Sequence, residues 1–439
     1  SLITKFLDTY ISSNSRYFIV TFASTNKDMR NTPYYIYILL AIACIALPVK
    51  ATEQAPKQTE VADSTTTSHY IHQIAIDAMP GLILHTNEFL RGSNPEVRTM
   101  NHNMGLRLKY AFSAPEQSKE AQIFRDAYQG IGIGYNDFNH QLGNPLSVFL
   151  LQGARIASLS NHLSLNYEWN LGLAFGWHPY NEESNPDNKV IGSKVTAYIG
   201  LDFYLRWILS RHVDLNIGIG AAHYSNGNTQ YPNLGLNTAF VNIGAAYYIG
   251  RKSDHLLYRH QTVSPVSHNI TYDLIMYGAW RQRGGYDGDY PFLLEGKTAV
   301  VGFNFNPMYR LNHWLKLGAS LDGTYDRTAN LYYDVDYIDP KYNDQYRRPS
   351  TAKQMTLGMS ARAEFTMPYF AINFGIGKNF LNTEGEFGGM YEVLALKINI
   401  TQRSLLHIGY SLNNFHTPKH LMLGVGWRFG KISTNHSKR

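Results

Sequence analysis

His223 and Ser225 lie two residues apart in the stretch AAHYSNGNTQYPNLGLN, where an apolar alternation gives way to a polar turn. A serine hydroxyl attacks an ester when a histidine takes its proton, and the histidine works best when a third group orients its other ring nitrogen. Side chains two positions apart on a strand project from one face, and the opposite strand of a hairpin can supply the third group. The spacing therefore points to nucleophilic ester hydrolysis; the alternative is a His and a Ser that only line an interfacial turn.

The turn that follows the serine contains donors suited to a developing negative charge. Asn226 and Gly227 offer backbone N–H groups, and Asn233 offers a side-chain amide. Such donors stabilise the oxyanion of a tetrahedral intermediate when they lie close to the attacked carbonyl. We therefore expect these three residues to form the oxyanion and loop part of the candidate site, and this chemistry requires no metal or cofactor.

Two strands with a period of two must hold this turn. The first, expected over 212–225, alternates apolar residues, and the same phase continues into His223 and Ser225. The second, expected over 237–249, begins its apolar phase at Asn237. If the apolar phase faces lipid, these three polar residues face it too, which is costly in the hydrocarbon and much less so at the membrane edge.

The same alternation recurs along the chain after residue 70. In residues 195–207 every odd position is apolar and the residues between are polar or small, and residues 163–177 divide in the same way. Strands of this length exceed the five or six residues that are common in soluble sandwiches, the alternative fold. Expected strands lie at 75–85, 104–113, 127–138, 146–158, 163–177, 195–208, 212–225 and 237–249, with about eight more between 269 and 430.

Composition and the N-terminal segment indicate export. Aromatic residues make up 13% of the chain, whereas charged residues make up 16%, below the usual quarter. An apolar run that follows Arg30 ends in a small-x-small pattern, which predicts a signal peptide, Met29–Ala51, and Cys44, the only cysteine, lies within it. The residues after 51 include 34 basic and 31 acidic side chains, a balance that indicates no nucleic-acid-binding face.

These features favour an all-β, antiparallel outer-membrane barrel, the closed sheet that satisfies every backbone polar group in lipid. The self-sufficient first half and the long linker favour two eight-stranded barrels over one wide barrel of about sixteen strands. With the N-terminus in the periplasm, odd strands run outward, and the hairpin 223–237 meets lipopolysaccharide at the outer leaflet. We expect an extension and signal peptide (1–51), a disordered leader (52–69), a first barrel half (70–250), a linker (251–268), a second set of strands (269–430) and a polar tail (431–439).

The stretch HYSNGNTQYPNLGLN resembles the signature of the PagL family, lipid A 3-O-deacylases of the Gram-negative outer membrane, whose fold is an eight-stranded barrel with a membrane-facing site. The resemblance covers about residues 70–250, and the whole chain is similar to longer members identified as acyloxyacyl hydrolases in Bacteroides-type bacteria. It implies His223 as the base, Ser225 as the nucleophile, and Asn226, Gly227 and Asn233 as oxyanion and loop residues.

The chain departs from the family pattern at one position. The acid of the family is a Glu on the eighth strand, and the residue here is Asn237. An Asn carbonyl orients a histidine but carries no charge, and replacing a triad Asp by Asn has cost a serine protease about 10⁴ in turnover. Asp202 and Asp214 lie in the polar phase of their strands, so we expect them in the lumen rather than beside His223.

The sequence thus predicts a carboxylic ester hydrolase that removes an acyl chain from lipid A, with lipopolysaccharide and outer-membrane lipids as its partners. One alternative is a non-catalytic barrel, either a channel or a lipid-binding structural protein, and Asn237 is its best argument. Another is a broader esterase or phospholipase. The sequence leaves open the oligomeric state and which acyl chain is removed. A partial echo of the hairpin, GYSLNNFHTPKHLMLG, suggests a duplication, although its Ser411 falls in the polar phase.

Overall fold

The computed structural model describes residues 69–116, 118–256, 265–287, 290–293, 296–333, 346–415 and 417–430. The expected signal peptide, the leader up to residue 68 and the polar tail lie outside these residues. No helix in the described ranges combines the length and the apolar character needed to cross a membrane.

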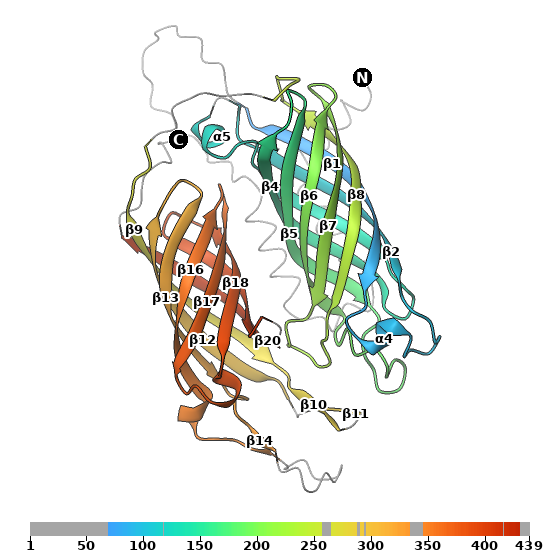
Figure 1. The fold of residues 1–439 in the computed structure, drawn as a ribbon, viewed down its shortest axis with the longest axis vertical. Coiled ribbons are helices and arrows are strands. Elements are labelled where there is room, and N and C mark those ends of the chain that lie inside the picture. The colour runs from blue at the N-terminus through green and yellow to red at the C-terminus, as the bar shows by residue number, and fades with distance from the viewer. Residues whose placement is uncertain are drawn as a thin grey trace, which may run out of the picture. The chain divides into compact units, whose positions relative to one another are not determined.

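The first sheet is a closed antiparallel barrel in which each strand pairs with the next and the eighth pairs back with the first (Figure 1). Its strands are β1 (Ile71–Leu84), β2 (His102–Ser113), β3 (Tyr128–Asp137), β4 (Gly143–Ser158), β5 (Leu163–Trp177), β6 (Val195–Ile208), β7 (Val213–Ser225) and β8 (Leu236–Ile249). Two short helices, α4 (Glu88–Arg91) and α5 (Lys119–Ile123), lie in the first two connections.

The second sheet is another closed eight-stranded antiparallel barrel. Its strands are β9 (Ile270–Arg281), β12 (Thr298–Arg310), β13 (Leu315–Asp326), β16 (Met355–Thr366), β17 (Phe370–Leu381), β18 (Met390–Asn399), β19 (Ser404–Asn413) and β20 (Thr417–Gly430). Its connections carry two short ribbons, β10 (Gly284–Asp287) with β11 (Tyr290–Leu293) and β14 (Tyr332–Tyr333) with β15 (Tyr346–Arg347), and the 3₁₀ turns η2 (Thr351–Gln354) and η3 (Gly385–Phe387). The all-β prediction of sixteen barrel strands is confirmed, and the strands form two barrels rather than one.

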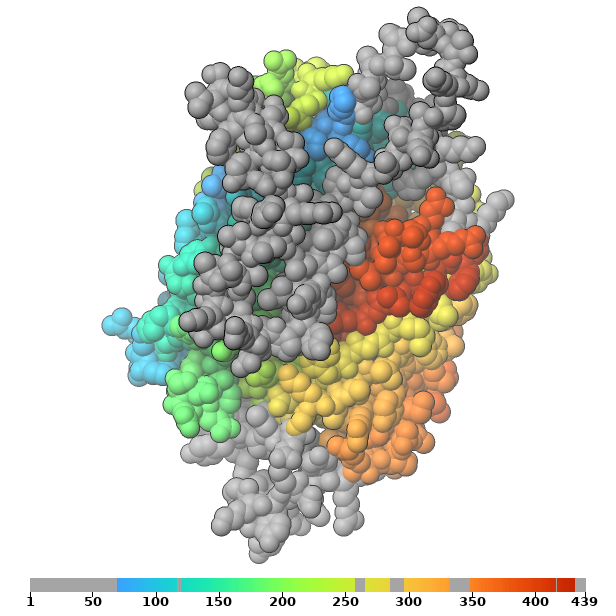
Figure 2. Space-filling view, turned by 180° about the vertical axis from the view of Figure 1, so that it is seen from behind, coloured from blue at the N-terminus to red at the C-terminus, as the bar shows by residue number. Residues whose placement is uncertain are grey.

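The period-two pattern sorts the side chains of each strand between lumen and outer surface. In β6, Leu201, Phe203 and Trp207 are 44%, 45% and 55% exposed, whereas Asp202 and Arg206 between them are buried. The apolar phase therefore faces outward, the reverse of a water-soluble barrel. In the space-filling view the side chains of the second barrel form a continuous outer surface over its yellow-to-red strands (Figure 2).

The lumen of the first barrel is filled by charged groups that form ion pairs with one another. The Arg107 guanidinium donates to both carboxylate oxygens of Asp202 at 3.0 Å. The Lys109 ammonium lies 2.7 Å from Asp77 and 3.0 Å from Glu168. All five side chains are buried, so each charge is compensated by a partner and not by bulk water. An eight-stranded barrel has an interior that side chains can fill, and this one is filled.

The second lumen repeats the same solution with different residues. The Lys397 ammonium lies 3.0 Å from Asp273 and 2.6 Å from Glu364. Toward the C-terminal end of β13, Arg362 pairs with Asp322 at 2.8 Å. These side chains are buried as well, and they close the middle of the barrel with ion pairs.

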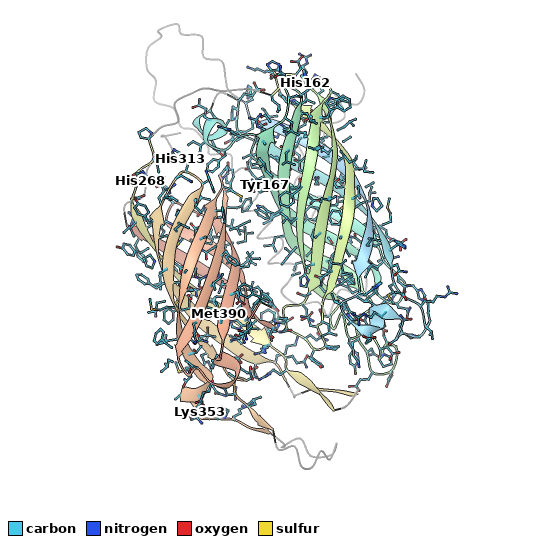
Figure 3. The ribbon with its side chains drawn as sticks, in the orientation of Figure 1. His162, Tyr167, His268, His313, Lys353 and Met390 are labelled. Carbon is cyan, nitrogen blue, oxygen red and sulfur yellow. The ribbon has the colours of Figure 1, made fainter. Side chains whose placement is uncertain are left out.

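Connection lengths distinguish the two ends of each barrel. In the second barrel, 327–354 and 382–389 connect strands at one end, whereas 311–314, 367–369 and 400–403 are short turns at the other. Figure 3 shows His268 and His313 at the short-turn end of this barrel and Lys353 and Met390 toward the opposite end. In the first barrel, 178–194 and 226–235 join strands at the end opposite the short turns 159–162 and 209–212. The 226–235 hairpin therefore lies at the long-loop end of the first barrel, which is the external end in outer-membrane barrels.

Substitution of Lys109 by Met should destabilise the first barrel. It leaves Asp77 and Glu168 buried without their shared cation, and breaking a buried pair in this way costs about 3 kcal/mol or more. Denaturant unfolding of the refolded full chain in detergent measures the loss. Lys252→Met, which removes an exposed lysine, is the matched control, and equal stability of the two variants would show that the lumen network contributes nothing.

Candidate active site

The β7–β8 hairpin brings the three predicted polar residues to one end of the first barrel. His223 is the direct cross-strand partner of Asn237, and on its other side it faces Ile199 of β6. Ser225, the last residue of β7, faces Ala197. The three residues continue the outward phase set by Ile217 and Ile219, so the candidate site lies on the outer surface and not in the lumen.

A short hydrogen bond fixes the histidine ring. The Nδ1 atom of His223 lies 2.7 Å from Oδ1 of Asn237. Because an amide oxygen only accepts, Nδ1 carries the proton and Nε2 is left with a free lone pair. His223 is half-buried, and Nε2 has no partner among the described residues yet is not fully enclosed. This is the tautomer that a base acting through Nε2 needs.

Ser225 lies beside the histidine but is not yet engaged with it. Within the described part of the chain, no hydrogen bond joins Ser225 Oγ to His223, and the serine is 8% exposed. The Oγ atom is not completely enclosed by the described residues. The hydroxyl therefore remains accessible from outside the protein. Hydrogen bonds between catalytic groups often tighten only when the substrate binds.

The turn residues are held together by their own side chains. The backbone N–H of Asn226 donates to Oδ1 of Asn233 at 2.9 Å, and Nδ2 of Asn233 donates to Oδ1 of Asn228 at 3.2 Å. The structure therefore brings Asn226 and Asn233 together, although both donors are occupied. The N–H of Gly227, which adopts φ +65°, has no acceptor among the described residues and is the donor that remains available.

Gly235 is a further site residue that the sequence did not reveal. Its φ of +76° favours glycine, and a Cβ atom there would lie 2.9 Å from Cε1 of His223. Its N–H donates to the carbonyl of Val190, in the β5–β6 connection, at 3.0 Å. Gly235 thus allows the chain to pass directly against the histidine ring, and the neighbouring loop holds it there.

The β5–β6 connection that supports Gly235 is held together by hydrogen bonds from one of its own side chains, Asn188. Asn188 is buried, and its Oδ1 accepts the N–H groups of Val190 and Ile191 at 3.1 and 3.2 Å. Its Nδ2 donates to the carbonyl of His178 at 2.8 Å. A single asparagine therefore organises the loop that contacts the hairpin.

Aromatic rings pack in the lumen behind the site. Tyr224, between His223 and Ser225, points inward and is 1% exposed. Its ring meets Phe138 and Trp177 edge to face, with centroids 5.6 and 5.3 Å away. Because this cluster locks the inward residue of the strand, the residues on either side of it project outward in fixed directions.

The lumen acids are not available to the histidine, as the sequence predicts. Asp202 is engaged by Arg107, and Asp214 accepts from Arg251 at 2.8 and 2.7 Å. Both side chains are buried in the lumen, on the opposite face of the sheet from His223. No group of three or more His, Cys, Asp or Glu side chains in the described part of the chain is arranged to hold a metal ion.

A closed antiparallel barrel with an apolar outer surface and buried ion pairs across its lumen belongs to the class of outer-membrane β-barrels, and this one carries His223, Ser225 and Asn237 on its outer face. Residues 102–246 match the family described as lipid A 3-O-deacylase (PagL). Residues 270–431 match the acyloxyacyl hydrolase C-terminal domain, PagL_C. The chain therefore belongs to the PagL family of outer-membrane lipid A deacylases, and it carries this second domain after the first.

The crystal structure of the outer-membrane enzyme PagL shares 15% sequence identity with this chain. The match covers 40% of this chain and 98% of the PagL chain, with a TM-score of 0.25. The crystal structure of the siderophore receptor PirA from Acinetobacter baumannii shares 8% sequence identity. That match covers 78% of this chain and 68% of the PirA chain, with a TM-score of 0.22. No curated protein sequence matches the chain.

Gly235→Ala should displace the ring of His223. A β-carbon at this positive φ lies too close to Cε1, so either the turn or the ring must shift. In a crystal structure of the variant we expect the distance from His223 Nδ1 to Asn237 Oδ1 to exceed hydrogen-bonding range. Gly278→Ala is the control, because a Cβ there meets only ordinary contacts. An unchanged His223–Asn237 distance in the Gly235 variant would contradict this positioning role.

Proposed function

We propose that this chain is a lipid A deacylase in which Ser225 is the nucleophile and His223 the base. The observation that carries the proposal is the 2.7 Å hydrogen bond from His223 Nδ1 to Asn237 on the outer surface of the barrel. This bond leaves Nε2 free on the same face of β7 as Ser225. The family match supports lipid A as the substrate.

The proposed reaction proceeds by two acyl transfers. Ser225 Oγ attacks the carbonyl carbon of an acyl ester while His223 Nε2 takes its proton, and the ester carbonyl oxygen becomes an oxyanion. The intermediate collapses, His223 returns the proton to the leaving sugar hydroxyl, and an acyl-serine remains. Water, deprotonated by His223, then attacks the acyl-serine, so that Ser225 is regenerated and a fatty acid departs into the leaflet.

The donors for the oxyanion come from the turn after Ser225. Gly227 N–H has no acceptor among the described residues, so no existing hydrogen bond has to open before it donates to the oxyanion. Asn226 N–H is bound to Asn233 Oδ1 and becomes available only if that bond opens. Each such donor contributes substantially, since removal of one in a serine hydrolase has lowered turnover by about 10²–10³.

The surface next to the site fits an acyl chain. Small side chains surround the site on the outer face. Ala197 faces Ser225, and the next outward-facing pair after His223 and Asn237 is Ala221 with Ala239. Further along the same face, Ile219 and Val241 are exposed. A shallow apolar path therefore runs from the nucleophile toward the membrane interior, where the hydrocarbon tail of a lipid lies.

The ion pairs that cross both lumens argue against the channel alternative. Both barrels are crossed by buried ion pairs, Arg107–Asp202 in the first and Lys397–Asp273 in the second. A conducting pore would require these pairs to part, which is strongly unfavourable. A broader esterase or phospholipase shares the same site and is distinguished by its products from defined phospholipid vesicles.

Ser225→Ala should abolish deacylation while the barrel still folds. Removal of the nucleophile is expected to lower turnover by about 10³-fold or more. Mass spectrometry of lipid A from cells that express the variant should show the fully acylated form. Ser158→Ala, an exposed serine at the far end of β4, is the control and should deacylate normally. An identical deacylation pattern from the Ser225 and Ser158 variants would refute the proposed nucleophile.

Asn237→Asp should raise the deacylation rate. It replaces the acceptor of His223 by a charged group of the same size, which stabilises the imidazolium that forms as the serine is deprotonated. We expect a gain of roughly tenfold or more, with Asn237→Glu as the parallel variant carrying the family residue. Initial rates on purified lipopolysaccharide in detergent provide the measurement. A rate equal to or below that of the native chain in both variants would show that residue 237 does not act through the histidine.

A further inference from the structure

The second barrel contains a polar cavity at its external end that the proposed deacylation does not use. Its volume is about 40 Å³, and it is open on one side. The residues that matter to its chemistry are Arg281, Asp326, Ser411, Lys419 and His420, from β9, β13, β19 and β20. Part of this lining comes from the echo segment GYSLNNFHTPKHLMLG, whose Ser411, Lys419 and His420 line the cavity and do not rebuild the outward site of the first barrel.

A β-bulge gives this cavity an unusual pair of neighbours. Ser411 pairs with His420 across the β19–β20 ladder, but the next residue, Leu412, pairs with Pro418. Lys419 is therefore the extra residue of the bulge. Without a bulge, adjacent residues point to opposite faces of a sheet; here Lys419 and His420 both line the cavity.

The acids that line the cavity already have cationic partners. Asp326 accepts from Arg281 at 2.7 Å, and Asp322 accepts from Arg362 at 2.8 Å. Glu386 pairs with Arg283. The two charges within each pair neutralise one another, so these carboxylates need no further cation.

Three groups in the cavity remain without partners. Within the described residues, the Lys419 ammonium makes no ion pair or hydrogen bond, and it lies 5.7 Å from the centroid of the Phe387 ring. His420 is 5% exposed, stacks on Tyr277 and leaves Nε2 enclosed with no acceptor or donor. Ser411, opposite His420, makes no hydrogen bond there either. A buried polar group without a partner is costly unless something else completes it.

We propose that Lys419, His420 and Ser411 form a binding site for an oxyanion, a phosphate or carboxylate group of a small molecule that enters from the external mouth. An ammonium, an imidazole N–H and a hydroxyl supply three donors, and an oxyanion accepts from all of them. The Lys419 ammonium provides the only unpaired charge among the described lining residues, and it is positive. This site is separate from the deacylase proposal and stands without it.

Calorimetric titration of the purified full chain in detergent tests the site. Sodium phosphate and sodium acetate, each against matched ionic strength, distinguish a phosphate site from a carboxylate site. We expect saturable binding of at least one of them, and Lys419→Met should weaken it roughly tenfold or more, because a charge-assisted hydrogen bond is lost. Lys378→Met, which removes an exposed lysine of β17 in the same barrel, should bind like the native chain.

Ser411→Ala keeps the test decisive if the lysine variant fails to fold, as judged by heat-modifiable migration in gels. It removes one neutral donor and should weaken binding severalfold. The proposal is overturned if neither anion binds saturably to the native chain. It is overturned equally if the folded Lys419 or Ser411 variant binds as tightly as Lys378→Met.

Discussion

In a closed sheet immersed in lipid, each side chain points either outward to the lipid or inward to the lumen. The other features of this protein depend on which residues the sequence places in each direction. The apolar phase points outward over the full length of the strands, as β6 illustrates with exposed Leu201 and Phe203 beside buried Asp202. Charges buried in the inner phase are stabilised by pairing, which explains the networks around Lys109 and Lys397. The same two-way choice decides which polar residues reach the membrane and which stay in the lumen.

His223, Ser225 and Asn237 are the exceptions to this division, because they occupy the outer phase without being apolar. Their position at the external end of the strands limits the cost, since the lipid boundary there is polar. The hydrogen bond between His223 and Asn237 pairs Nδ1 with Oδ1 and at the same time selects the ring tautomer. One contact therefore pairs two polar groups on the outer surface and leaves Nε2 of His223 free, as the proposed chemistry requires.

Much of this arrangement could be predicted from the sequence. Period-two alternation identified β5 (Leu163–Trp177) and β6 (Val195–Ile208) to the residue, since each long strand has one continuous apolar phase. The pairing of His223 with Asn237 remained unknown, because register depends on the length and conformation of the turn. The role of Gly235 was hidden for a similar reason: a glycine reveals its importance only when the positive φ and the nearby ring are seen. The inward pair Lys419–His420 escaped because a bulge breaks the alternation on which the prediction relied.

Labelling of the full chain in outer-membrane vesicles with a lipophilic fluorophosphonate, followed by peptide mapping, tests the central claim most directly. Such a reagent reacts with a serine whose proton is taken by a neighbouring base, and its alkyl tail partitions into the leaflet. The account predicts modification at Ser225 and its loss in a His223→Ala variant that retains the barrel. Absence of the label from Ser225, or equal labelling with and without His223, would contradict a lipid-facing serine nucleophile activated by that histidine.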